Sequence, residues 1–426
     1  MRALFAAHPT VGHTQALRAI AHALRARGDV VDFAITGLPK LPSFVPMPQP
    51  LRAGLDVLDG LARDGVPLLR LPGSLKTAFA AARVASSRGY DELAWACRLF
   101  TADALASARI LVEHLERTGT DVVVADYAYF GAWLAAERAG VPFVALYHSG
   151  LPFPVEDRPP FGSGLPAGAP RAQWHPAQQR LEAILAQVDG ALAAARRSLG
   201  LPPVAPRLLT RPYAQHLNVL ATFEAMELAR PDGPVLWAGP CLGPRATASD
   251  DFPWQALEGE EPIVYVSLGT VFNAQPALYR TLLEGVHHAG ARAVVAAGAS
   301  LEAVQRVARP TDVVRRFVPQ VALLSKVSAF ISHGGNNSTN EALRAGTPLV
   351  LVPFGGEQIS NAQRAEALGV GTWLDAQSLD VAAVTRAVQA ALTPERRDVS
   401  RALAAKLPEG DGVPRVVEAL VRLAGK

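Results

Sequence analysis

The sequence predicts an α/β protein of two domains, each built around a parallel sheet, and three observations lead to that prediction. The chain has 426 residues, of which 50% are hydrophobic, and this is enough to fill two cores. Short apolar runs alternate with amphipathic, helix-like segments in both halves, as in right-handed βαβ units. A stretch at 239–261 with Pro, Gly and small polar residues interrupts this alternation and is typical of a linker.

The first domain is expected at 1–238 and opens as strand, helix and strand. Residues 3–7 form an apolar run, 14–27 have apolar residues at helical spacing, and 30–35 form a second apolar run. His13 lies in the loop between the first strand and the helix. Because open α/β sheets bind ligands beyond the carboxyl ends of their strands, we expect His13 at the functional edge of the sheet.

Two further strands of this domain end in residues that carry chemistry. Asp126 and Tyr127 follow the run 121–125, and His148 follows the run 142–147. A histidine and a carboxylate at neighbouring strand ends suggest a general base and the group that orients it. From the residues alone, an alternative stays open, in which His13 caps the following helix and Asp126 accepts hydrogen bonds from local amides.

The second domain is expected at 262–405, and its most informative stretch is 328–346. A short buried strand, His333, two glycines and a helix from Asn337 follow one another there. Free amides and the helix dipole make such a turn an anion site, which favours a diphosphate ligand. Two alternatives stay open: Ser338 and Glu341 fit a capping box, and His333 with its glycines fits an ordinary turn. A lipase oxyanion motif is excluded, since the chain has no Gly-x-Ser-x-Gly elbow.

Composition limits the class of function. The formal net charge is +3, from 41 basic and 38 acidic residues, and no dense Lys/Arg block suggests nucleic acid. The two cysteines lack metal-ligand spacing and fit a reducing cytosol. The N-terminal apolar run is too short for a signal peptide, and no apolar stretch is long enough to span a bilayer, so we expect a cytoplasmic protein. Neither a Walker A loop nor an Asp-x-Asp metal pair is present.

Three segments resemble, in order and spacing, the donor-binding signature of the UDP-glycosyltransferase superfamily, which includes bacterial natural-product and macrolide glycosyltransferases. They are Phe317-Val-Pro-Gln320, His333-Gly-Gly-Asn-Asn337-Ser338-Thr-Asn-Glu341 and Pro353-Phe-Gly-Gly-Glu357-Gln358. The resemblance implies a GT-B fold, in which two Rossmann-like domains face a central cleft. It further implies that the first domain binds the acceptor, that the second binds the donor, and that the helix at 406–426 packs back on the first.

The resemblance also implies roles for single residues. His13 would be the general base and Asp126 its partner, although Thr14-Gln15-Ala16 replaces the Asn-Pro that many relatives carry after this histidine. Tyr127 and His148 would line the acceptor pocket, which the long loop 151–172 would help to shape. The expected donor-binding residues are Ser267, Gly269, Thr270, Val318, Gln320, His333, Gly335, Asn337, Ser338, Glu341, Glu357 and Gln358.

The predicted reaction is inverting, metal-independent transfer of a hexose from a nucleoside-diphosphate sugar to a hydroxyl of a hydrophobic natural product. The pair Glu357-Gln358 favours UDP-glucose over a thymidine-linked deoxysugar. We expect no bound cofactor and no metal, and as partners only the donor and the acceptor, without nucleic acid or membrane, in a monomer or homodimer. Two alternatives stay open: a non-catalytic homologue that activates a partner glycosyltransferase, and a GT-B sugar-nucleotide epimerase.

Overall fold

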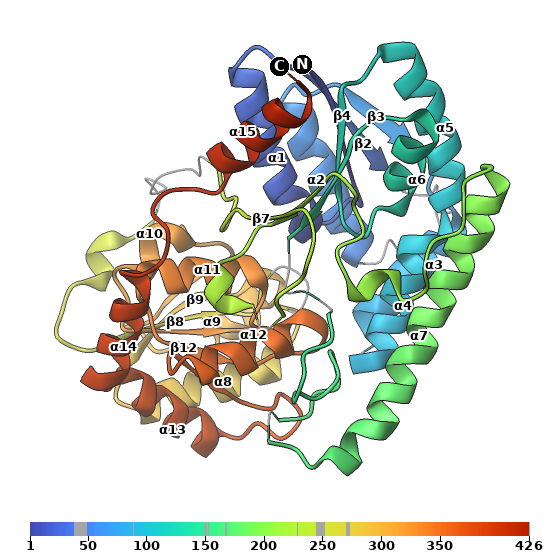
Figure 1. The fold of residues 1–426 in the computed structure, drawn as a ribbon. Coiled ribbons are helices and arrows are strands. Elements are labelled where there is room, and N and C mark those ends of the chain that lie inside the picture. Colours follow the sequence, from blue (N-terminus) through green and yellow to red (C-terminus); the bar gives the residue numbers. More distant parts are fainter. Residues whose placement is uncertain are drawn as a thin grey trace. The chain divides into compact units, whose positions relative to one another are not determined.

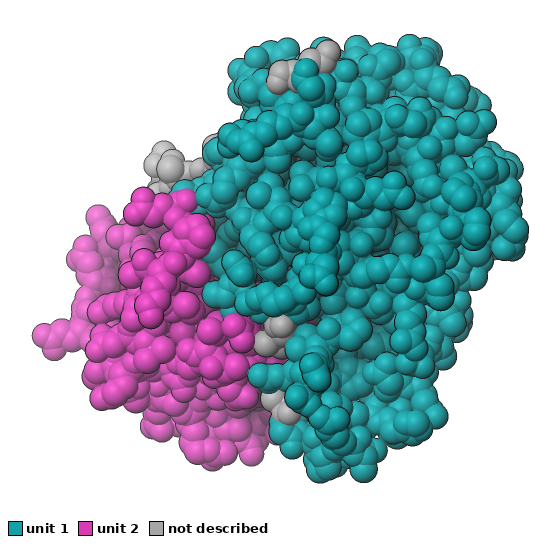
Figure 2. Space-filling model, viewed as in Figure 1, with its two compact units in different colours: residues 1–244, 410–426 teal, residues 245–409 magenta. Residues whose placement is uncertain are grey.

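The computed structural model describes residues 1–37, 49–87, 89–148, 151, 153–166, 168–227, 229–243, 252–269 and 273–425. The chain forms two compact units (Figure 2), of which unit 1 comprises Met1–Pro244 and Gly410–Lys426 and unit 2 comprises Arg245–Glu409. The boundary between Pro244 and Arg245 lies inside the stretch expected to be a linker.

Unit 1 is organised around a sheet of seven parallel strands in the order β3-β2-β1-β4-β5-β6-β7. These strands are β1 (Arg2–Ala7), β2 (Val30–Thr36), β3 (Leu68–Leu71), β4 (Val122–Asp126), β5 (Phe143–Tyr147), β6 (Leu217–Leu220) and β7 (Val235–Trp237). The inner strands β1, β4 and β5 are almost entirely buried, because helices cover both faces of the sheet. Their apolar runs are therefore continuous rather than alternating.

The α-helices of unit 1 lie between these strands in the sequence, except α15, which follows unit 2 in the chain (Figure 1). They are α1 (Val11–Ala26), α2 (Gln49–Arg63), α3 (Leu75–Ser86), α4 (Gly89–Ala102), α5 (Ala104–Thr118), α6 (Phe130–Ala139), α7 (Arg171–Ser198) and α15 (Val413–Leu423). The described residues between β5 and α7 form no helix or strand.

The last helix of the chain is part of unit 1. Figure 1 shows α15 beside α1, and the two helices are in contact. Val413, Val416 and Leu420 are buried in the same core as Leu17 and Ile20 of α1. The apolar residues of α15 recur every three or four positions, so one face of the helix is buried and the other meets solvent.

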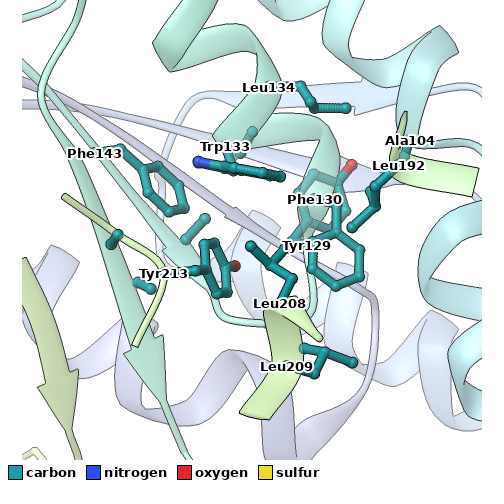
Figure 3. Packing of buried hydrophobic residues seen from close by; sticks show 14 of the residues in the cluster. Ala104, Tyr129, Phe130, Trp133, Leu134, Phe143, Leu192, Leu208, Leu209 and Tyr213 are labelled. Atoms are coloured by element: carbon teal, nitrogen blue, oxygen red, sulfur yellow. The ribbon is translucent and has the colours of Figure 1, made fainter. Parts of the chain in front are cut away.

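An aromatic cluster fixes α6 on the other face of the sheet (Figure 3). The ring centroid of Tyr213 lies 5.2 Å from that of Trp133, 6.1 Å from that of Phe130 and 6.2 Å from that of Phe143. Such separations are typical of favourable stacked, tilted and edge-to-face aromatic pairs. Because α6 directly follows β4, this packing also fixes the strand end at Asp126.

Unit 2 contains a second parallel sheet, of six strands in the order β10-β9-β8-β11-β12-β13. Its strands are β8 (Ile263–Ser267), β9 (Arg292–Ala296), β10 (Val313–Arg315), β11 (Ala329–Ser332), β12 (Leu349–Leu351) and β13 (Gly371–Trp373). Its α-helices are α8 (Pro276–His288), α9 (Leu301–Gln305), α10 (Gln320–Leu324), α11 (Asn336–Ala345), α12 (Gly356–Ala367), α13 (Val381–Leu392) and α14 (Pro394–Ala404). In the part of the chain that the structure describes, no helix is both long and apolar enough to cross a membrane.

Candidate active site

The first candidate site lies where β1 and β4 end side by side. Ala3–Ala6 pair in register with Val122–Ala125, so the loop after β1 reaches the carboxyl end of β4. His13, expected in the loop before the helix, lies in the first turn of α1. Its Nδ1 is 2.9 Å from Oδ1 of Asp126. The side chain of Asp126 is 0% exposed, whereas that of His13 is 18% exposed. The pair therefore consists of a buried carboxylate behind an accessible imidazole.

A second imidazole shares the same carboxylate. His148 follows β5, and its Nδ1 lies 2.5 Å from Oδ2 of Asp126. The backbone N–H of Ala128 donates a further hydrogen bond of 3.0 Å to Oδ1. The two histidine rings have centroids 4.1 Å apart. The structure thus brings together three of the predicted residues, and Tyr127 joins them with its ring centroid 5.7 Å from that of His148.

The charge of Asp126 determines the tautomers of both histidines. Burial alone would raise the pKa of Asp126, but His13 and His148, through charge and hydrogen bonds, outweigh burial and hold that pKa far below its usual value. An ionised carboxylate only accepts hydrogen bonds, so each Nδ1 carries a proton and donates it. Nε2 of His13 is therefore the atom that can take a proton from a substrate.

The same three side chains resemble a metal-ligand set. Ligand atoms of His13, Asp126 and His148 all lie within 4.8 Å of one another. Two imidazoles and one carboxylate are ligands that several transition metals accept. In the structure, the Nδ1–H group of each histidine already donates a hydrogen bond to the Asp126 carboxylate. The three side chains can therefore act together as an acid–base centre.

A third histidine in this region was missed by the sequence analysis. His8 directly follows β1 and is 7% exposed. Its ring packs against Tyr129 and Phe100, and burial lowers its pKa to about 4. It borders a cavity of about 10 Å³, roughly the space of one water molecule. A polar residue directly after a fully buried strand is the signal that could have indicated it.

The second candidate site lies in unit 2, where β8 and β11 end side by side. Ser267 pairs with Ser332, and His333 follows directly. Gly334 adopts a φ of +83°, which favours glycine. A Cβ at Gly269 or at Gly335 would come within 2.6 or 2.5 Å of the His333 ring. These glycines therefore let the imidazole lie against the backbone.

His333 lies at the start of α11. The ring is half-buried, and its Nδ1 is buried without a hydrogen-bond partner among the described residues. Burial lowers the pKa of His333 to about 4, partly opposed by the backbone of Ser267. A neutral imidazole beside a helix N-terminus can donate one hydrogen bond to an anion, together with the first amides of the helix.

The capping-box alternative for α11 is wrong. The helix begins at Asn336 after Gly335, so Ser338 is its third residue and cannot cap it. Glu341 instead accepts a hydrogen bond of 2.8 Å from Nε2 of Gln320. That same Nε2 lies 3.2 Å from Oγ of Ser338. No side chain caps the helix start at Gly335.

Of the other predicted donor residues, one lies outside the described residues. Val318, Asn337 and Glu357 are half-buried, and Glu357 is in the first turn of α12. Gln358 is buried, and its Oε1 accepts a hydrogen bond of 2.9 Å from the backbone N–H of Phe354. Thr270 lies outside the described residues.

Comparisons with known proteins show which family the chain resembles. Residues 245–399 match the family model "UDP-glucoronosyl and UDP-glucosyl transferase". The NDP-glycosyltransferase YjiC of Bacillus subtilis (strain 168) is 29% identical over 276 residues, which cover 63% of this chain and 64% of the relative. The 4'-demethylrebeccamycin synthase of Lentzea aerocolonigenes is 30% identical over 306 residues, covering 67% of this chain and 69% of the relative. The chain thus matches about two thirds of the length of each of these relatives.

Two solved structures share the fold over nearly the whole chain. The glycotransferase of kitacinnamycin has a TM-score of 0.75 at 21% identity, with 99% of both chains covered. The glycosyltransferase VinC, solved in complex with dTDP, has a TM-score of 0.68 at 18% identity, with 100% of both chains covered.

The two parallel-sheet, Rossmann-like domains match solved glycosyltransferase structures of the GT-B class. This confirms the predicted fold class. The chain belongs to the UDP-glucoronosyl and UDP-glucosyl transferase family. The predicted enzyme class is confirmed at the level of that family.

Proposed function

We propose that this protein transfers a hexose from a nucleoside-diphosphate sugar, with UDP-glucose favoured, to a hydroxyl group of a hydrophobic small molecule. The transfer inverts the anomeric carbon and uses no metal ion. The observation that carries the proposal is the hydrogen bond of 2.9 Å between Nδ1 of His13 and the buried carboxylate of Asp126. This bond holds the imidazole as a base whose Nε2 faces away from the carboxylate.

On the acceptor side, the chemistry is a single displacement. The acceptor oxygen forms a bond to the anomeric carbon while the bond from that carbon to the diphosphate oxygen breaks. Nε2 of His13 takes the hydroxyl proton as the new bond forms, because a free alcohol is too weak a nucleophile near neutral pH. Asp126 stabilises the resulting imidazolium, since it stays ionised in its buried position. A single attack on the anomeric carbon, from the face opposite the leaving diphosphate, inverts the configuration of that carbon.

On the donor side, the leaving nucleoside diphosphate gains negative charge. The first amides of α11 and the His333 ring are the groups proposed to stabilise it. The glycines at 269 and 335 leave the imidazole room beside the helix start, which supports this role for His333. This electrostatic contribution does not require a cation.

The donor class is proposed from groups near that turn. Glu341 would accept hydrogen bonds from the ribose, and Glu357 and Gln358 would contact the sugar hydroxyls. Oε1 of Gln358 accepts a hydrogen bond from the backbone N–H of Phe354. The side-chain amide nitrogen of Gln358 is therefore the atom proposed to contact the sugar. The relative VinC was solved with dTDP, which supports a nucleoside diphosphate as the general donor class.

The proposal is tested by incubating the purified chain with UDP-glucose or dTDP-glucose and a panel of hydrophobic phenols and macrolides. We expect a glucoside whose anomeric configuration, read by NMR, is opposite to that of the donor. The rate should stay the same after EDTA treatment and extensive dialysis. Donor consumption that releases free sugar without an acceptor would favour the epimerase, and no consumption would favour the auxiliary homologue. A rate that is lost with EDTA and restored by a divalent ion would contradict metal independence.

A further inference from the structure

Three side chains of unit 2, far apart in the sequence, form a hydrogen-bonded chain that ends on Glu341. The hydroxyl of Tyr265, on β8, donates to Oε1 of Gln320, the first residue of α10, over 2.9 Å. Nε2 of Gln320 donates to Oε2 of Glu341, on α11, over 2.8 Å. These elements are labelled in Figure 1. These two hydrogen bonds therefore connect the sheet core to a carboxylate at the candidate donor site.

Tyr265, at one end of this series of hydrogen bonds, is held rigidly. Tyr265 is 1% exposed, and its ring stacks on Phe330 of the neighbouring strand with centroids 4.5 Å apart and planes 10° apart. Burial raises the pKa of Tyr265 above its ordinary value, so the hydroxyl keeps its proton and remains a donor. A fixed donor of this kind can set the orientation of a group that is itself only half-buried.

That orientation matters because the glutamine amide has two unlike ends. With Oε1 facing the tyrosine hydroxyl, the NH₂ group faces both Ser338 and Glu341. A flipped amide would place its carbonyl oxygen against the carboxylate oxygen, and two acceptors repel each other. The hydroxyl of Tyr265 thus adds to the preference for the amide orientation in which the NH₂ group faces Glu341.

We propose that Tyr265, acting through Gln320, positions the Glu341 carboxylate for the ribose 2'-hydroxyl of the donor. Tyr265 is then a positioning residue that sets selectivity for a ribonucleotide over a 2'-deoxyribonucleotide. The inference rests on the proposed function, in which Glu341 meets the ribose. A carboxylate can accept about four hydrogen bonds, so the bond from Gln320 is compatible with a hydroxyl on the same group.

The test compares binding of UDP and of 2'-deoxyuridine diphosphate by calorimetry in the wild type and in Tyr265→Phe. Phenylalanine keeps the ring that stacks on Phe330 and removes only the hydroxyl. One lost hydrogen bond corresponds to about a two- to tenfold weaker Kd, and we expect this loss for UDP but less than about twofold for the deoxy nucleotide. The wild-type preference for UDP should shrink accordingly.

Tyr279→Phe is the matched control. Tyr279 is also buried in unit 2, and its hydroxyl donates to the backbone oxygen of Ala296 over 3.0 Å. Loss of this hydroxyl removes a buried hydrogen bond of similar length that does not reach Glu341. We expect a similar decrease in Tm for both variants, with the UDP preference unchanged in Tyr279→Phe.

The outcomes separate the inference from the proposed function. If Tyr265→Phe weakens both nucleotides equally, or neither, then Tyr265 has only a structural role and the inference is wrong while donor binding stands. A wild type that binds the two nucleotides equally also overturns it, because Glu341 then does not read the 2'-hydroxyl. If the wild type binds neither nucleotide, the proposed function fails as well.

Discussion

Asp126 stays ionised although its side chain does not reach solvent. A buried carboxylate is costly unless hydrogen bonds replace its hydration. His13, His148 and the amide of Ala128 supply three such bonds. His13 and His148 therefore stabilise the ionised Asp126 carboxylate, and this one carboxylate in turn sets the orientation of both imidazoles.

His8 makes the stability of unit 1 depend on pH. Its pKa is about 4 in the folded protein, against 6.5 in the unfolded chain, so unfolding takes up a proton between these values. The stabilisation from the neutral ring is present above pH 6.5 and is lost as the pH falls toward 4. We expect His8 to contribute roughly 3 kcal/mol to this loss.

Urea unfolding of the wild type and of His8→Asn at pH 7, 5.5 and 4.5 measures this contribution. The variant should lose less stability on acidification than the wild type. His175→Asn is the control, because His175 is exposed on α7, and its curve should follow that of the wild type. Parallel pH dependence in His8→Asn and wild type would show that His8 is not responsible.

At this scale, some residues could be predicted from sequence and others could not. His13 and Asp126 were placed together because both follow strands of one predicted sheet, and the structure joins them. Their catalytic roles stay predictions. Tyr265 was not indicated, because it looks like an ordinary apolar strand residue and its partner Gln320 lies 55 positions away. Long-range pairing of a buried hydroxyl leaves no local pattern.

Among the elements, α11 carries most of the proposed donor site. It begins at a glycine without a side-chain cap and ends at Gly346, which has a φ of +68°. The sequence predicted both ends to within about one residue, because glycine marks a helix end. It left the capping box open, since Ser338 and Glu341 fit that pattern equally well until the helix start is known.

Gly335→Ala should weaken donor binding by displacing His333. The backbone of Gly335 has a φ of -61°, which alanine tolerates, but the new Cβ would lie 2.5 Å from Nε2 of His333. Displacement of that ring should raise the Kd for UDP by about tenfold or more. Binding is measured by calorimetry.

Gly190→Ala is the matched substitution for this experiment. Gly190 lies within α7, where a Cβ would meet open space, so the change should leave UDP binding unaltered and stabilise the helix by roughly 0.5–1 kcal/mol. Unchanged UDP binding in Gly335→Ala would mean that the position of His333 does not matter for the donor.

The terminal helix α15 should be essential for the stability of unit 1. Leu420 is 0% exposed in the core that also contains Leu17 of α1. Leu420→Ala leaves a cavity and should lower the free energy of unfolding by about 2–5 kcal/mol, measured by urea denaturation. Val399→Ala, at a position that is 44% exposed on α14, should change it by less than about 0.5 kcal/mol. Equal effects would show that α15 contributes little to the core.

The whole molecule consists of two units with the same design, in which a parallel sheet presents polar residues at the carboxyl ends of its strands. The alternation of apolar runs and amphipathic segments was enough to predict this class. The edge strands β3 and β7 of unit 1 were not predicted, because three or four residues at a sheet edge carry little periodic signal. The acceptor was not predictable, since the residues expected to shape its pocket lie in the irregular segment before α7.

The central claim is that His13 is the base for the acceptor hydroxyl. Its most direct test compares wild type and His13→Ala in steady-state transfer from UDP-glucose, with UDP binding measured by calorimetry on the same preparations. Loss of a general base should lower kcat/KM by about 10²- to 10⁴-fold, while the Kd for UDP stays within about tenfold of the wild-type value. Undiminished transfer by His13→Ala, or a loss of UDP binding as large as the loss of transfer, would contradict the claim.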